Sequence, residues 1–123
     1  MELIRKGIQP GVVALEISGE MRTSGERSRL TQAIDEAIQK NERGIILDLS
    51  RLELIDSAGV GTIVLCYSRL RRIGGTLRVA GPKGMVETVL KLTQIHRAID
   101  FFPTVAEAAH NCPPADEKPA SSD

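Results

Sequence analysis

Residues 45–50, Ile-Ile-Leu-Asp-Leu-Ser, form the segment that most limits the folds open to this chain. The run is apolar at almost every position, and Asp48 is its one acid. A strand with one face in water alternates apolar and polar residues, whereas a strand covered on both faces reads as a continuous apolar run. The segment therefore predicts a central strand of a parallel sheet with both faces covered.

The segments on either side predict how that sheet is built. Residues 3–19 read as two strands joined by a tight turn at Pro10-Gly11, in which Gly11 supplies the positive φ. Helical and strand patterns then alternate to residue 110, which implies a parallel sheet with helices packed on it. The predicted fold class is α/β: a mixed sheet of four to five strands with an N-terminal hairpin, flanked by four helices.

Local patterns give more detailed expectations for the helices. Thr23 and Glu26 have the spacing of a capping box, and Gly44 is expected to end the first helix in a left-handed turn. Apolar residues recur at helical spacing in two later segments and predict their buried stripes. These stripes are Val60, Ile63, Val64, Tyr67 and Leu70 in the second helix, and Met85, Val89 and Leu92 in the third.

Composition narrows the class of protein. A length of 123 residues fits one domain, predicted at residues 1–111, and the Pro-, Ser- and charge-rich residues 112–123 predict a disordered tail. The formal net charge is zero and aromatic residues make up 2%, which argues against direct nucleic-acid binding. Cys66 and Cys112 are far apart, and no segment resembles a signal peptide or a membrane span. A reduced, cytoplasmic protein without membrane insertion is expected.

Catalytic and metal sites fit the sequence poorly. Ser57 lacks the Gly-x-Ser-x-Gly context of a nucleophile, and His96 and His110 are expected at the surface. Two lone histidines and two distant cysteines do not form a metal-ligand cluster. The glycines of residues 59–64 match only part of a dinucleotide-binding motif. A basic group is interpreted as a solvated helix face, and comprises Arg69, Arg71, Arg72 and Arg78.

The segment Asp-Ser-Ala-Gly-Val-Gly at residues 56–61 is the strongest candidate site. Asp56 or Ser57 suits a helix N-cap, because either side chain accepts hydrogen bonds from free N–H groups. A cap does not explain Gly59 and Gly61, since each glycine costs about 1 kcal/mol in a helix interior relative to alanine. Glycines there would leave Ser57 open, and a helix start tolerates a phosphate. A phosphate on Ser57 would therefore stand where the fold tolerates it, and a simple helix cap remains the alternative.

Residues 45–64 resemble the signature of STAS domains, in particular those of bacterial anti-sigma factor antagonists. The resemblance extends over about residues 2–110 and includes the hairpin and the Gly19-Glu20 strand end. By this resemblance Ser57 is the regulatory phosphorylation site, with Asp48 and Asp56 as matching acids. The predicted partner-binding surround comprises Met21, Arg22, Thr23, Ser24, Asp48, Asp56, Ala58, Gly59, Val60 and Gly61.

The resemblance implies a partner-switching regulator rather than an enzyme, with no cofactor and no metal. The unmodified domain would bind an anti-sigma factor with serine kinase activity, be released when Ser57 is phosphorylated, and be reset by a serine phosphatase. Val60 would provide an apolar contact. Arg22 stands where many members have an acid, and would attract the phosphate. The alternatives are an unphosphorylated STAS adaptor of a lipid-transport or other membrane transport complex, and a small nucleotide-binding protein; the oligomeric state is open.

Overall fold

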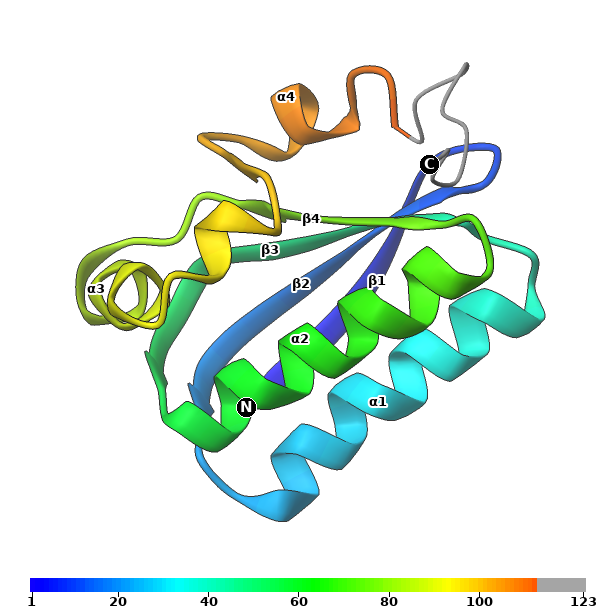
Figure 1. The fold of residues 1–123 in the computed structure, drawn as a ribbon. Helices are drawn as coiled ribbons and strands as arrows, with labels where there is room; N and C mark the ends of the chain where they lie inside the picture. Colours follow the sequence, from blue (N-terminus) through cyan, green and yellow to red (C-terminus); the bar gives the residue numbers. More distant parts are fainter. Residues whose placement is uncertain (113–123) are drawn as a thin grey trace.

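In the computed structural model, which describes residues 1–112, five strands form one mixed sheet in the order β1-β2-β3-β4-β5 (Figure 1). The first pair is antiparallel and the other pairs are parallel, so the predicted α/β fold class is confirmed. The strands are β1 (Glu2–Gln9), β2 (Val12–Met21), β3 (Gly44–Ile55), β4 (Thr76–Ala80) and β5 (Phe101–Phe102). The helices are α1 (Ser24–Gln39), α2 (Ser57–Arg72), α3 (Gly84–Leu92) and α4 (Val105–Ala109), with a 3-10 turn η1 (Ile95–Arg97).

The helices cover the sheet unequally. Helices α1 and α2 lie side by side on one face, and α4 lies on the other (Figure 1). The main core fills the space under α1, α2 and α3, and includes Ile45, Leu47 and Leu49 of β3. Ile46 points to a smaller core under α4. The prediction that β3 is covered on both faces is thus confirmed for its first half.

The domain boundary predicted at residue 111 falls near the end of the described residues. Cys112, which was assigned to the tail, is buried in the smaller core, and its carbonyl accepts a hydrogen bond from Gln9. The other residues of the predicted disordered tail, 113–123, lie outside the described residues. The boundary therefore remains a prediction.

Turn and cap chemistry was largely predictable. Gly11 has a φ of +80° in the hairpin turn, and Thr23 and Glu26 form the full capping box at the start of α1. The expectation for Gly44 is wrong. Asn41, with a φ of 64°, makes the left-handed turn after α1, and Gly44 is already the buried first residue of β3. Asparagine tolerates this conformation because its short side chain bonds locally.

Strand β3 extends further than its apolar run. It continues to Ile55, which pairs with Met21 at the end of β2. The β2–β3 pairing contains two register shifts, between Glu16 and Ser18 and between Gly19 and Glu20. A single residue, Asp56, therefore links β3 to α2.

The buried stripe predicted for α3 is wrong at its ends. Val86 and Leu90 are buried, and Val89 is partly buried against the core. Met85 and Leu92 are 58% and 77% exposed. The segment is apolar around most of its circumference, so the position of α3 against β3, rather than the sequence pattern, selects which side is buried.

The buried stripe of α2 needs a smaller correction. Val60, Ile63 and Leu70 are buried as predicted, but Cys66 takes the core position expected for Val64. Val64 is 37% exposed. The helix is thus rotated slightly relative to the predicted stripe, which leaves Val64 on its outer side.

Arg78 is not part of a solvated basic face. It is 8% exposed in β4, and its guanidinium donates hydrogen bonds to the carbonyls of Ala108, His110 and Asn111 at distances of 2.9–3.3 Å. It also lies 5.3 Å from the centre of the Phe102 ring. One buried cation therefore caps the C-terminal end of α4 and holds it on the sheet.

We predict that Arg78→Met lowers the free energy of unfolding by about 1–3 kcal/mol, because the carbonyls at the end of α4 lose their donors. Urea denaturation measures the loss, and hydrogen exchange should show α4 opening first. Arg72→Met, at an exposed position of α2, is the control and should change stability by less than about 0.5 kcal/mol. Equal stability of the two variants would contradict the role of Arg78.

Burial also raises the pKa of the Cys66 thiol, from its ordinary value of 9.0 to about 11. Below pH 9 the thiol is neutral in both states. Between pH 9 and 11 it ionises in the unfolded state first, so the stability of the fold decreases as the pH rises. We predict that Cys66→Ala reduces this decrease, by up to about 1.4 kcal/mol per pH unit. Urea denaturation of both proteins from pH 8 to 11 tests this prediction. An identical dependence of the unfolding free energy on pH in the two proteins would contradict it.

Candidate functional site

Asp56, rather than Ser57, caps α2. Its backbone is extended, and its Oδ1 atom accepts a hydrogen bond of 2.9 Å from the backbone N–H of Gly59. Ser57 is the first residue of the helix itself. The sequence left open whether Asp56 or Ser57 caps α2, and the structure assigns the cap to Asp56.

Ser57 is an exposed side chain with small neighbours. Within residues 1–112, its hydroxyl takes part in no hydrogen bond. Ala58 is exposed, and so is Gly61, one helical turn further on. A Cβ atom at Gly61 would have nothing within 4 Å. The hydroxyl of Ser57 is therefore accessible and is not needed by the local structure.

Gly59 has a different role from Gly61. It is buried, and a Cβ atom there would lie 2.7 Å from Cγ1 of Ile55 and 3.4 Å from Sδ of Met21. The first turn of α2 thus packs against the ends of β2 and β3 at a distance that only glycine allows. The expectation that both glycines keep Ser57 open holds for Gly61 and needs correction for Gly59.

Besides Gly59, two residues of the predicted partner surface are buried beneath it. Met21 is fully buried, and Val60 is 4% exposed. Both belong to the main core, so the expected apolar contact through Val60 is incompatible with its position. Met21 lies under the first turn of α2 and pairs with Ile55, and Val60 anchors the same turn in the core.

The β2–α1 loop lies beside the start of α2. Because Met21 and Ile55 are paired in parallel strands, residues 22–24 and 56–58 leave the sheet at the same edge. Arg22, Thr23 and Ser24 are exposed there. The Arg22 guanidinium lies 3.4 Å from Glu20, an exposed pair that contributes little to stability.

Glu26 stiffens this loop. Its carboxylate accepts hydrogen bonds from the backbone N–H groups of Arg22 and Thr23, at 2.8 Å and 3.0 Å. These bonds hold the pKa of the Glu26 carboxyl below its ordinary value. The loop that flanks Ser57 is therefore ordered by the capping box of α1.

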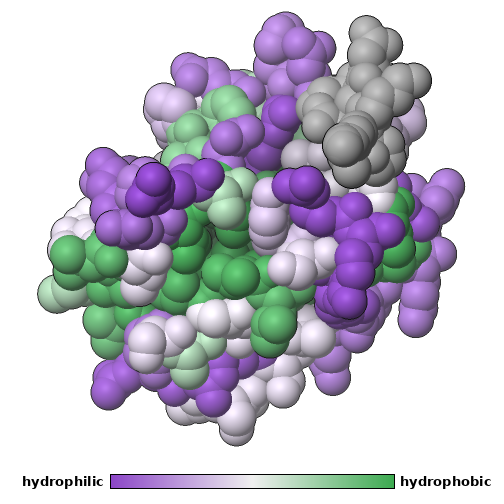
Figure 2. Space-filling model, in the orientation of Figure 1, coloured by the Kyte–Doolittle hydropathy of each residue, from purple (hydrophilic) through white to green (hydrophobic). Residues whose placement is uncertain are grey.

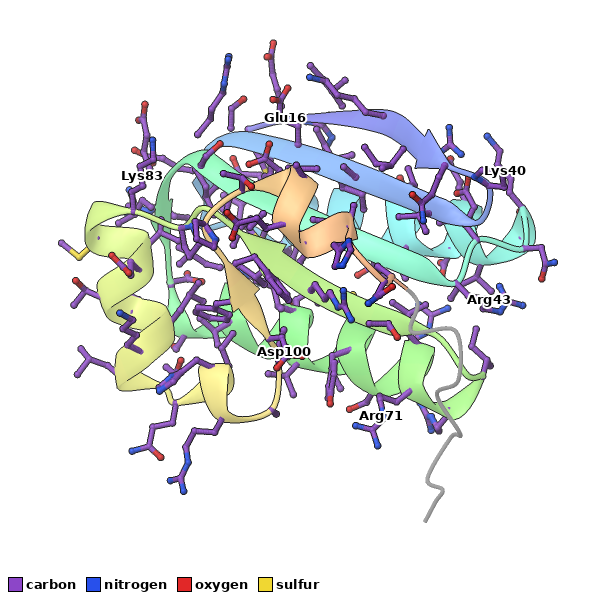
Figure 3. The ribbon with its side chains drawn as sticks, turned by 90° about the horizontal axis from the view of Figure 1, so that it is seen from above. Glu16, Lys40, Arg43, Arg71, Lys83 and Asp100 are labelled. Carbon is purple, nitrogen blue, oxygen red and sulfur yellow. The ribbon has the colours of Figure 1, made fainter. Side chains whose placement is uncertain are left out.

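Asp48 does not belong to this site. It lies seven residues before Ile55, roughly 20 Å along β3. Its carboxylate accepts hydrogen bonds from the backbone N–H and the hydroxyl of Ser50, at 3.1 Å and 2.7 Å. It lines a separate cavity of about 250 Å³ with Lys83, which stands at the start of α3 (Figure 3). These bonds lie beside the register shift of the β2–β3 pairing between Glu16 and Ser18, away from Ser57.

Other chemistry finds no assembled site in the part of the chain that the structure describes. His96 and His110 are exposed and belong to different segments. No group of three or more potential ligands among residues 1–112 could hold a metal ion. None of the helices in this range has the length and hydropathy needed to cross a bilayer.

Leu65 was missed by the sequence predictions. It is 67% exposed on the outer side of α2, two turns after Ser57. The signal was present in the sequence, because no Asp, Glu, Lys or Arg occurs between Ser57 and Ser68. A surface helix whose first three turns carry no charge is unusual in a chain with 26% charged residues.

The family follows from a match that covers nearly all of the described fold. Residues 4–108 match the STAS domain. The chain belongs to the STAS domain family. The resemblance read from residues 45–64 is therefore confirmed.

Relatives of this STAS domain carry names from sigma-factor regulation. A Thermotoga neapolitana protein, provisionally named as a homologue of an anti-sigma factor antagonist, is 35% identical over 74 residues. The match spans 60% of this chain and 66% of that protein, just under two thirds of its length.

Solved structures share the fold. A Thermotoga maritima protein, provisionally named an anti-sigma factor antagonist, is 26% identical with a TM-score of 0.76, over 90% of this chain and 94% of that chain. The phosphorylated form of the Bacillus cell fate determinant SpoIIAA is 20% identical with a TM-score of 0.70. That match covers 89% of this chain and 98% of SpoIIAA, and it shows the fold alone.

Two substitutions in this STAS domain distinguish the capping role of Asp56 from the free hydroxyl of Ser57. We predict that Asp56→Ala lowers the free energy of unfolding by about 0.5–2 kcal/mol, because Gly59 loses the acceptor for its N–H. Ser57→Ala should change it by less than about 0.5 kcal/mol, because the hydroxyl makes no bond within the described residues. Urea denaturation measures both. A larger loss for Ser57→Ala than for Asp56→Ala would reverse the assignment.

Proposed function

We propose that this STAS domain is an anti-sigma factor antagonist whose binding is switched by phosphorylation of Ser57. In its unmodified form it binds a cognate anti-sigma factor that has serine kinase activity, and so frees the sigma factor. The kinase transfers a phosphoryl group from ATP to Ser57, the complex dissociates, and a serine phosphatase restores the hydroxyl. The domain is a binding protein and a substrate, and the chemistry belongs to its partners.

One observation carries the proposal: the Ser57 hydroxyl is exposed and makes no hydrogen bond within residues 1–112. Asp56 provides the cap and Gly59 the close packing, so Ser57 is free for modification. The names of the relatives support the choice of partner. The phosphorylated Bacillus structure supports the kind of modification.

The position of Ser57 explains why a phosphate would change binding and leave the fold intact. A phosphoserine adds about 1.5–2 negative charges, which are tolerated beside the free N–H groups at a helix start. In an interface the same charge must be paired or stripped of water, which weakens binding unless the partner offers a cation. Modification therefore acts on the partner surface.

Arg22 determines how much of the negative charge of a phosphate on Ser57 is neutralised within this domain. It is the exposed cation of the neighbouring β2–α1 loop, and its pair with Glu20 is easily broken. A contact with phosphoserine 57 would hold part of the new charge on the domain. Arg22 then tunes the release of the partner rather than deciding whether release occurs.

The test combines the domain with its anti-sigma factor kinase and Mg-ATP. We predict that one phosphate is added and that peptide mass spectrometry places it at Ser57. Ser57→Ala should bind the partner but accept no phosphate, and Ser57→Asp should bind at least tenfold more weakly in calorimetry.

Ser24→Ala is the matched control, because Ser24 is an exposed serine at the start of α1 beside the same site. It should be phosphorylated like the unmodified sequence. Phosphate at Ser24, or equal affinity of the Ser57→Asp variant, would contradict the proposal. A partner that binds without ever phosphorylating the domain would favour the adaptor alternative.

A further inference from the structure

The outer side of α2 carries no charge over its first three turns. Its exposed positions from Ser57 to Ser68 are hereafter called the uncharged face, and comprise Ser57, Ala58, Gly61, Val64, Leu65 and Ser68. The charged residues of α2 begin at Arg69, and Arg71 lies near the far end of the helix (Figure 3). Helix α1, of the same length, carries charges along its whole course. Cores of protein interfaces are depleted in charged residues, whereas free surfaces are not.

Gly61 leaves a gap between the side chains of this face, hereafter called the notch. It is exposed in the second turn of α2, and no atom lies within 4 Å of the place where a Cβ would stand. Alanine would stabilise an exposed helix position of this kind, so the fold gives no reason for glycine. Gly59 provides the contrast, because its Cβ would collide with Ile55.

The notch adjoins Ser57. Cα–Cβ bonds of a helix tilt toward its N-terminus, so a side chain at position 61 would cover the turn that contains residue 57. Without a side chain there, the space beside the Ser57 hydroxyl is open. Leu65, 67% exposed, stands one turn further on and bounds the notch from the other end.

The surroundings of the notch are apolar. Figure 2 shows hydrophobic side chains gathered over the middle of α2 and over α3. Val64 and Leu65 of α2 are 37% and 67% exposed. A side chain that enters the notch thus meets apolar neighbours on α2 and finds no charge to pair with there.

We propose that the notch at Gly61 receives an apolar side chain of the anti-sigma factor, with Leu65 packing against it. The inference rests on the proposed function and names the contact that gives the complex its affinity. A phosphate on Ser57 would stand at the rim of the notch and bring charge into an uncharged contact. The phosphate would thus expel the inserted side chain, in keeping with the cost of burying an unpaired charge.

The experiment measures the melting temperature of four variants of the unphosphorylated domain and their affinity for the purified anti-sigma factor. We expect Gly61→Ala to raise the melting temperature by about 4 °C and yet to weaken binding of the anti-sigma factor at least tenfold in calorimetry. Leu65→Ala should weaken binding at least tenfold with little change in melting temperature. The controls are Ile73→Ala, an exposed apolar residue at the C-terminal end of α2 and outside the uncharged face, and Ile4→Ala, an exposed apolar residue on the opposite face of the sheet. Both should bind within threefold of the unmodified sequence.

The outcomes separate this inference from the proposed function. If the unmodified domain binds the anti-sigma factor and Gly61→Ala binds equally well, the notch is not a contact and the inference is overturned while the function stands. If the unmodified domain does not bind an anti-sigma factor at all, both are overturned. Opposite signs for stability and affinity in Gly61→Ala support the inference, because a purely structural role would move the two together.

Discussion

The first turn of α2 packs so closely against the ends of β2 and β3 that only glycine fits at position 59. Gly59 lies against Ile55 and Met21, which are paired across the two strands. This contact fixes where α2 begins and which side of the helix faces the core. Ser57 is turned outward as a consequence, and the β2–α1 loop leaves the sheet beside it. The exposure of the Ser57 hydroxyl is therefore a consequence of the close packing at Gly59.

The same packing separates the residues of the family signature into two groups. Gly59, Val60 and Met21 are buried and build the support, while Ser57 and Gly61 are exposed and form the surface. Asp56 connects the groups, because it caps the helix from an exposed position. A modification of Ser57 can thus alter what a partner meets without disturbing the core, which is the property a switch requires.

Much of the fold was predictable because local signals agreed with it. The apolar run of β3, the turn at Pro10-Gly11 and the capping box at Thr23 each depend on short-range chemistry. The errors came from interactions between distant segments. Arg78 finds its carbonyl partners some thirty residues later, and α3 takes its orientation from β3. Val60 was assigned to the partner surface through the family resemblance, although its place in the predicted buried stripe of α2 already indicated the core, where the structure puts it. Asp48 was grouped with Ser57 through the resemblance to the family signature, although an extended strand places the two residues far apart.

The central claim is that partner binding centres on the uncharged face of α2 and on the loop beside it. The most direct test is nuclear magnetic resonance. The backbone amide signals of the unphosphorylated domain are followed while the anti-sigma factor is added. The account predicts that the largest changes fall in residues 22–25 and 57–68 and that they are lost when Ser57 is phosphorylated. Changes centred on α4 or on the outer edge of β1, with residues 57–68 unaffected, would contradict it.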